Sequence, residues 1–157
     1  SGRLHAQPWL MASPLDLSKR DGKPQLVIFE QKVCAGCDEM HAEGFPRPEV
    51  AALLQRYRAA RVDIAANEVL KTPNGKSLAM RDWARQLKIA YTPSFVFFDA
   101  GGREVFRVEG YLRPFHLASS LDYVASGAYR KQPEFQRFIE ARAAARREKG
   151  EKIELMK

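Results

Sequence analysis

Cysteine and histidine are scarce in this sequence, and long apolar runs are missing. The 157 residues include two cysteines and three histidines. Two cysteines cannot build a disulfide-rich scaffold, nor can they alone complete a four-ligand structural zinc site. No apolar run approaches the roughly 18 residues that a membrane-spanning helix requires. The sequence therefore predicts neither a disulfide-knotted miniprotein, nor a zinc-finger-like fold, nor a transmembrane helix.

The excess of positive charge is small and uneven. The formal net charge is +7, and residues 130–157 account for +4 of it, with nine Lys and Arg against five Asp and Glu. Most aromatic residues lie in apolar runs that are typical of a core. A nucleic-acid surface combines clustered basic and aromatic side chains. We therefore do not expect a nucleic acid as partner.

Length and composition indicate one globular domain with flanking segments. A chain of 157 residues that is 45% hydrophobic and 29% charged can bury a core of its own. Residues 1–24 contain three prolines and are expected to form an entry segment with one short helix near Trp9–Arg20. Residues 25–129 form the expected domain, and residues 130–157 are expected to be a basic helical extension.

Hydrophobic periodicity predicts an alternation of strands and helices. Expected strands are 25–30, 61–65, 94–98 and 104–108, and expected helices are 34–43, 48–57, 80–87, 114–126 and one that begins at 133. Because helix separates the first two strands, they are expected to pair in parallel through a right-handed crossover. Asn74-Gly75 is a hairpin signal. The order favours an α/β fold with a mixed central sheet flanked by helices, a small hairpin insertion and a C-terminal helical extension.

The most informative motif is Cys34-Ala35-Gly36-Cys37, which follows the first expected strand and opens the first expected helix. Two intervening residues place the sulfur atoms on one helical turn, where they can form a disulfide. Free amides and the helix dipole favour a thiolate here, so Cys34 is the candidate nucleophile and Cys37 the more shielded resolving thiol. Ala35 and Gly36 add little bulk where a substrate would approach. The motif predicts thiol–disulfide exchange, which needs no metal or organic cofactor.

A lone C-x-x-C motif also fits two other interpretations. His41 lies four residues after Cys37, so Cys34, Cys37 and His41 form a conceivable three-ligand metal cluster. The sequence offers no evident fourth ligand. An inert structural disulfide is the second alternative. The position between a strand and a helix start favours redox chemistry over both.

The motif and several further segments resemble the thioredoxin superfamily. The turn 34–37 resembles the thioredoxin active-site turn, 91–99 the segment with the cis-proline and next strand, 101–105 the hairpin, and 109–111 the glycine loop. A narrower resemblance is to the SoxW-type periplasmic thioredoxins of bacterial sulfur oxidation. It rests on 29–31, on Met40-His41 after the cysteine motif, and on 110–116, 123–130 and 135–137.

The resemblance implies a role for each matching residue. Cys34 would attack a substrate disulfide, and Cys37 would resolve the mixed disulfide. Pro93 would be cis and face the disulfide, Thr92 would offer its backbone to an extended substrate peptide, and Gly110 would leave room for that peptide. From the residues alone, Pro93 could also be an ordinary turn proline at the start of a strand.

Two positions depart from the thioredoxin pattern. Val33 stands where many thioredoxins have tryptophan, and Ile28 stands where they have a buried acid that is thought to relay a proton for the resolving cysteine. Glu30 lies two residues later and, by strand alternation, on the same face as Ile28. Glu30 is therefore a candidate for the proton role, the alternative being a solvated strand end. The missing acid favours a dedicated partner over general thioredoxin activity.

The resemblance also implies a cellular setting. A SoxW-like protein would be periplasmic, as a mature form without its signal segment. It would receive electrons from a membrane thiol–disulfide carrier and pass them to a protein disulfide. We expect a monomer that reduces protein disulfides. The alternative is a non-catalytic interaction module on the same fold, with the basic extension as its binding surface.

Overall fold

The computed structural model describes residues 2–111, 113–151 and 153. Ser1, Leu112 in the segment 110–116, and several of the last positions of the basic extension lie outside the described residues. The elements in chain order are β1 (Gln25–Glu30), α1 (Ala35–Glu39), the π-helix η1 (Met40–Gly44), α2 (Pro48–Leu54), β2 (Arg58–Asp63), β3 (Val69–Lys71), β4 (Ser77–Ala79), α3 (Met80–Gln86), β5 (Ser94–Phe98), β6 (Glu104–Glu109), α4 (Pro114–Ala125), α5 (Ala128–Lys131) and α6 (Phe135–Glu148).

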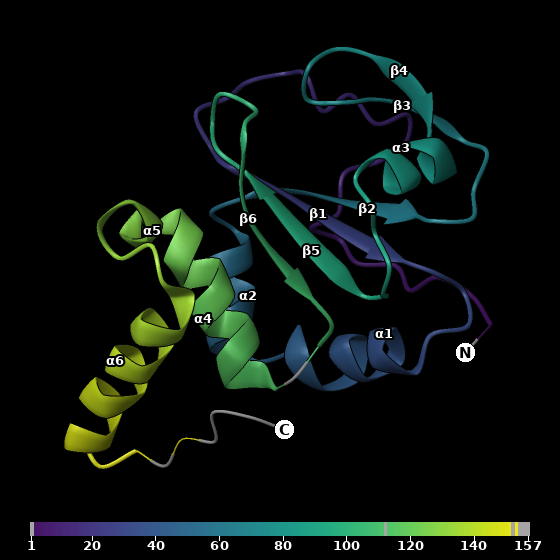
Figure 1. Cartoon of the computed structure of the whole chain (residues 1–157). Coiled ribbons are helices and arrows are strands. Elements are labelled where there is room, and N and C mark those ends of the chain that lie inside the picture. Colours follow the sequence, from purple (N-terminus) through teal and green to yellow (C-terminus); the bar gives the residue numbers. More distant parts are fainter. Residues whose placement is uncertain (1, 112, 152, 154–157) are drawn as a thin grey trace.

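Four strands form a central mixed sheet in the order β2-β1-β5-β6 (Figure 1). β1 pairs in parallel with β2, whereas β5 runs antiparallel to both β1 and β6. The parallel pair is connected through α1, η1 and α2, because two parallel strands need a crossover between them. The predicted α/β fold, with a mixed sheet between flanking helices, is confirmed.

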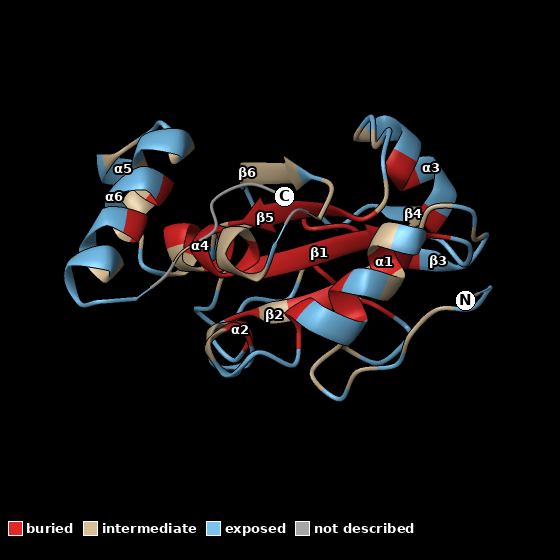
Figure 2. Cartoon of the chain, turned by 90° about the horizontal axis from the view of Figure 1, so that it is seen from below, coloured by how far each residue is buried: buried red, intermediate tan, exposed pale blue. Residues whose placement is uncertain are grey.

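β1 is buried along its whole length because both faces of the sheet are covered (Figure 2). Leu26 and Ile28 belong to a core shared with η1, α2 and α4. Val27 and Phe29 belong to a second core, shared with α3 and part of the entry segment. Side chains of a strand alternate between faces. Glu30 therefore lies on the Ile28 face, the side covered by η1.

The second strand begins earlier than predicted. β2 starts at Arg58, three residues before the expected 61, because Arg58 pairs with Gln25 at the start of β1. The extra residues include Ala59 and Ala60, whose small side chains have little strand propensity of their own. Pairing with β1 and burial in the core decide their conformation.

The expected helix near Trp9–Arg20 is wrong. This part of the entry segment is extended: Leu10 forms an isolated bridge with Ala59 on β2, and Asp16 forms one with Lys71 on β3. The prolines in the segment disfavour a helix because each removes a backbone donor. The segment therefore covers the edge of β2 and ties the hairpin to the sheet.

β3 and β4 form the hairpin that Asn74-Gly75 predicted. The turn closes through hydrogen bonds from the Gly75 amide to the Thr72 carbonyl (2.9 Å) and from the Thr72 hydroxyl to the Asn74 side chain (2.5 Å). Gly75 has a φ of +87°, a conformation that favours glycine.

The C-terminal helices are part of the packed structure. Ile139 and Ala143 of α6 are buried, and the Arg142 guanidinium bridges Glu49 of α2 (2.5 Å) and Asp122 of α4 (3.0 Å). These contacts fix one face of α6 against the domain, and its other face is exposed (Figure 2). No helix in the part of the chain that the structure describes is long and apolar enough to cross a bilayer.

Ile139→Ala is expected to lower the free energy of unfolding by about 2 to 5 kcal/mol, because it removes buried carbon and leaves a cavity between α6 and α4. Denaturant unfolding measures this loss. Glu140→Ala on the exposed face of the same helix is the matched control and should change stability by less than about 0.5 kcal/mol. Equal stabilities of the two variants would show that α6 does not stabilise the domain.

Candidate active site

The two cysteines lie at the start of α1, in the connection that follows β1. Cys34 is the extended N-cap residue of α1, and it forms a disulfide with Cys37, with 5.2 Å between the Cα atoms. The Cys37 amide donates a hydrogen bond to Cys34 Sγ (3.0 Å). Cys34 is 7% exposed and Cys37 only 1%. The outer sulfur is therefore the one that a visiting group would reach.

The helix after the disulfide is not regular. α1 continues directly into η1, where the Phe45 amide bonds to the Met40 carbonyl, five residues back (3.0 Å). Single-turn π segments of this kind often occur at functional sites. Here the π turn carries Met40 and His41, and both are buried. The predicted helix 34–43 is thus present, but its second half has a different winding.

The segment before β5 lies against the cysteine turn. The Thr92-Pro93 peptide bond is cis, as the resemblance implied. A Cβ atom added to Gly36 would lie 3.1 Å from Pro93 Cδ, so the proline ring touches the backbone between the cysteines. The Gln31 side chain donates to the Thr92 hydroxyl (2.9 Å) and ties the loop after β1 to the same segment.

The loop after β6 completes this side of the site. The Gly110 amide donates to the Pro93 carbonyl (2.8 Å). Gly110 has a φ of +105°, and the position of an added Cβ has no atom within 4 Å among the described residues. Tyr111 follows, and burial, with a smaller effect of Glu39, raises the pKa of its phenol. The loop thus leaves open space beside the cis-proline and adds no ionised group from Tyr111 near neutral pH.

Gly36→Ala is expected to lower kcat/KM for a peptide disulfide about tenfold, because the added methyl group displaces Pro93 from its position against the cysteine turn. Stability should fall by no more than about 2 kcal/mol, since alanine also favours the helix. Gly101→Ala, where the added Cβ makes ordinary contact in the β5–β6 turn, is the control. Unchanged kinetics in Gly36→Ala would contradict a substrate path over this turn.

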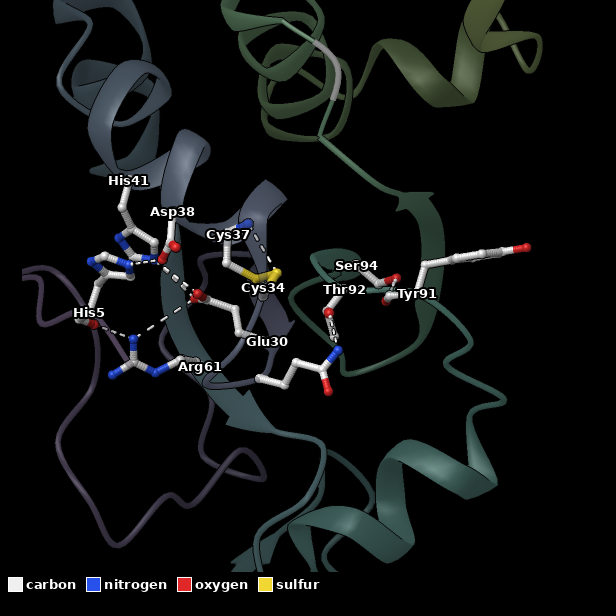
Figure 3. The surroundings of a disulfide bond; sticks show 11 residues. His5, Glu30, Cys34, Cys37, Asp38, His41, Arg61, Tyr91, Thr92 and Ser94 are labelled. Atoms are coloured by element: carbon white, nitrogen blue, oxygen red, sulfur yellow. Dashed lines mark hydrogen bonds and ion pairs between the residues drawn. A yellow bond between two sulfur atoms is a disulfide. The ribbon is translucent and has the colours of Figure 1, made fainter. Parts of the chain in front are cut away.

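Two exposed apolar side chains come directly before the two segments of the site. Val33 precedes Cys34 and is 79% exposed, and Tyr91 precedes Thr92 and is 66% exposed. Figure 3 shows the Tyr91 ring pointing away from the disulfide into open space. The sequence prediction missed Tyr91. The available signal was an aromatic residue directly before the Thr92-Pro93 pair.

Glu30 is buried and paired, so the alternative of a solvated strand end is wrong. Its residue exposure is 0%. His41 Nε2 lies 3.0 Å from Oε1 and 3.2 Å from Oε2 of Glu30. Arg61 of β2 contributes a guanidinium 3.9 Å from Oε2. The carboxyl group is therefore held from the helix and from the neighbouring strand.

The entry segment extends this network. The Gln7 side-chain Nε2 lies 3.0 Å from His41 Nδ1. The His5 ring stacks on the His41 ring with 4.5 Å between centroids, and His5 Nε2 lies 2.6 Å from Asp38 Oδ1. Arg61 donates to the His5 carbonyl (Figure 3). Sequence reasoning missed His5, Gln7 and Arg61, since only the fold brings them to Glu30.

The metal-cluster alternative has no support in the arrangement of its ligands. The sulfur atoms of Cys34 and Cys37 are bonded to each other, and His41 faces Glu30. Among the described residues, no group of three or more His, Cys, Asp and Glu side chains is arranged to hold a metal ion.

Comparisons with known proteins place this geometry in a family. Residues 11–125 match the family model of a thioredoxin-like domain. A thioredoxin-fold protein from Helicobacter pylori superposes with a TM-score of 0.76 at 15% identity, over 87% of this chain and 94% of that one. A thioredoxin from Thermus thermophilus gives 0.51 at 29% identity, over 66% and 74%.

A structure described as the DsbH oxidoreductase gives a TM-score of 0.50 at 20% identity, over 79% of this chain and 83% of that one. A search of the curated proteins found no significant match. The family match spans the sheet, the cysteine turn, the cis-proline segment and α4. The chain belongs to the family of thioredoxin-like domains.

Proposed function

We propose that this protein is a thiol–disulfide oxidoreductase that reduces disulfides in other proteins. One observation carries the proposal: the Cys34–Cys37 disulfide lies at a helix start, with the cis-proline segment directly against it. The similarity to the Thermus thermophilus thioredoxin supports the same chemistry.

The reaction has two steps. In the dithiol form, the Cys34 thiolate attacks one sulfur of the substrate disulfide. A mixed disulfide forms, and the first substrate thiolate leaves. Cys37 then loses its proton, and its thiolate attacks Cys34 Sγ. The Cys34–Cys37 bond forms, the mixed disulfide breaks, and the second substrate thiolate leaves with the electron pair. The substrate gains two electrons, and the dithiol loses them.

The surfaces beside the disulfide suit an extended peptide. The backbone groups of Thr92 would pair with the substrate main chain in the manner of an added strand. Gly110 leaves space for that chain, and Ala35 and Gly36 allow close approach to the sulfur atoms. This arrangement favours a protein substrate over a small molecule, because the contacts follow a backbone.

Glu30 is assigned the role of accepting the proton of the Cys37 thiol. Cys37 and His41 are four residues apart on one continuous helix and so share a face. Glu30, the last residue of β1, contacts His41 on that face. A buried carboxylate at this place can accept the proton that Cys37 must lose before it attacks.

The compartment and pathway are proposed from the sequence resemblance to SoxW-type proteins. The protein would act as a monomer in the periplasm, where disulfides persist. A membrane thiol–disulfide carrier would reduce its disulfide, and a periplasmic protein of a sulfur-oxidation pathway would receive the electrons.

Reduction of insulin disulfides by dithiothreitol tests the activity. The protein is expected to accelerate this reaction in proportion to its concentration. A non-catalytic interaction module on the same fold predicts no acceleration over a Cys34→Ser/Cys37→Ser double variant. That result would reject the oxidoreductase and leave the module.

A further inference from the structure

We propose that Gln7 and His41 are positioning residues for Glu30. Gln7 fixes His41 as a neutral imidazole with its proton on Nε2, and His41 donates that proton in a hydrogen bond to the Glu30 carboxylate. The proposal rests on the proposed function, because it gives Glu30 a defined partner in the second step of exchange.

The hydrogen-bond partners determine the state of the ring. The Gln7 amide nitrogen only donates, and it lies 3.0 Å from His41 Nδ1. In this orientation of the Gln7 amide, Nδ1 accepts the hydrogen bond and carries no proton. A neutral imidazole holds one proton, which places it on Nε2. Nε2 lies 3.0 and 3.2 Å from the two carboxylate oxygens, which accept. Each atom in the chain from Gln7 to Glu30 has a matching partner.

Residues from several elements surround the His41 ring and fix its orientation toward Glu30. Glu30 of β1 is below it, and the His5 ring stacks on it at 4.5 Å. Asp38 of α1 is 2.6 Å from His5 Nε2 and so faces His5. Arg61 of β2 is 3.9 Å from Glu30 on the opposite side from α1. Arg3 of the entry segment lines the same surface pocket as His5, Asp38 and His41, and Cys37 adds a thiol in the reduced form.

Gln7 can act this way because the entry segment is anchored on both sides of it. The Gly2 amide donates to the Lys32 carbonyl beside the cysteine turn (3.1 Å). Further along, the Met11 amide donates to the Ala59 carbonyl on β2 (2.9 Å). Residues before β1 in the chain therefore form part of the wall of the site. Figure 3 shows His5, Asp38 and His41 gathered on the side of Glu30 away from Thr92.

The tautomer decides where the Cys37 proton goes. In the second step Cys37 loses a proton to a Glu30 oxygen, the Cys37–Cys34 bond forms, and the substrate thiolate leaves with two electrons. His41 cannot take the proton from Glu30, because Nε2 already carries one and Nδ1 is occupied by Gln7. Glu30 therefore holds the proton at the end of this step. Loss of a partner that orients a metal ligand typically costs about 10- to 100-fold in activity, and we expect an effect of similar size here.

The tautomer is read directly by ¹⁵N NMR of the His41 ring in the full-length protein, where protonated and unprotonated ring nitrogens have different shifts. Wild type should show a protonated Nε2 and an unprotonated Nδ1 at pH 7. Gln7→Glu presents an acceptor to Nδ1 and should place a proton on that nitrogen as well as on Nε2. A wild-type ring with its proton on Nδ1, or on both nitrogens, would overturn the proposal.

Kinetics test whether the tautomer matters for exchange. Single-turnover mixing with a peptide disulfide and rapid alkylation separates the two steps. Gln7→Leu and His41→Leu should slow the release of the second substrate thiol about 10-fold or more and change its pH profile. Formation of the mixed disulfide, measured in the Cys37→Ser background, should keep its rate. His41→Gln offers an amide N–H near the position of Nε2 and should recover most of the lost rate.

Gln136→Leu on the exposed side of α6 is the matched control. A second step that is equally fast in Gln7→Leu, His41→Leu and Gln136→Leu would overturn the positioning role. Equal slowing of both steps would also overturn it, because that is the result of a general structural defect. If wild type forms no mixed disulfide at all, the proposed function fails instead, and the NMR result still decides the tautomer.

Discussion

Cys34→Ser is expected to reduce the catalysed rate of insulin reduction by at least about 1000-fold, because the nucleophile of the first step is lost. Cys37→Ser should also lose turnover, but it should still complete the first step and accumulate a mixed disulfide. The difference follows from burial: Cys34 is 7% exposed and Cys37 is 1% exposed, so only the outer sulfur is placed to meet a substrate. Stopped assays for released substrate thiol and for bound substrate measure the two steps.

Circular dichroism and the unfolding midpoint of both variants provide the control, since serine is close in size to cysteine. The two variants remove the same disulfide and should lose similar stability. Turnover by Cys34→Ser near the wild-type rate, or the same single-step behaviour in both variants, would contradict the assigned order of attack.

Glu30→Gln is expected to slow the second step of exchange by about 100-fold, because the amide keeps the shape of the side chain but cannot accept the Cys37 proton. The first step should be unchanged. Hydroxide deprotonates thiols increasingly as pH rises, so the gap between the variant and wild type should narrow toward alkaline pH. Single-turnover release of the second substrate thiol, measured from about pH 6 to about pH 9, tests this effect, because thiols titrate near the upper end of this range.

Glu140→Gln, on the exposed face of α6, is the matched control and should match wild type at every pH. Glu30→Leu tests the structural role of the carboxyl group, because it removes the buried partner of both His41 and Arg61. Its free energy of unfolding should fall by about 3 to 5 kcal/mol, the usual cost of removing one partner of a buried pair. A Glu30→Gln variant whose second step is as fast as wild type across this range would remove Glu30 from the mechanism.

The sequence predicted the parts of the fold that rest on local patterns. The run 25–30 is apolar and ends at the cysteine motif, and it forms the central strand β1. Asn74-Gly75 lies in the turn of the β3–β4 hairpin, where Gly75 takes the positive φ that favours glycine. The cis state of Pro93 came from the family resemblance alone, since the residues favour trans.

The errors occur where tertiary contacts override local preference. The extended path of residues 9–20 depends on edges of β2 and β3 that only the folded sheet provides. The first residues of β2 are small or charged, and their strand conformation comes from pairing with β1. Neither effect has a signature within a short window of sequence.

The sequence predicted the parts of the site that are contiguous in the chain, but not the contacts between residues that are distant in sequence. The cysteine turn is contiguous in the sequence, and the spacing of His41 from Cys37 indicates a shared helix face, although by itself it fits a metal ligand. The partners of Glu30 come from the entry segment, η1 and β2, and no periodic pattern links these regions. A glutamate that is buried at the end of a central strand requires polar partners, and this requirement is the one signal that could have indicated them.

Intact-mass measurement of the reduced Cys37→Ser variant, mixed with a disulfide-bonded peptide, tests the central claim most directly. The account predicts one peptide per chain, linked to Cys34, and its release by dithiothreitol. Cys34→Ser, treated identically, should bind far less peptide through the buried Cys37. An absence of adduct on a reduced and alkylatable Cys34, or equal labelling of both variants, would contradict a thiol–disulfide exchange that begins at the outer sulfur.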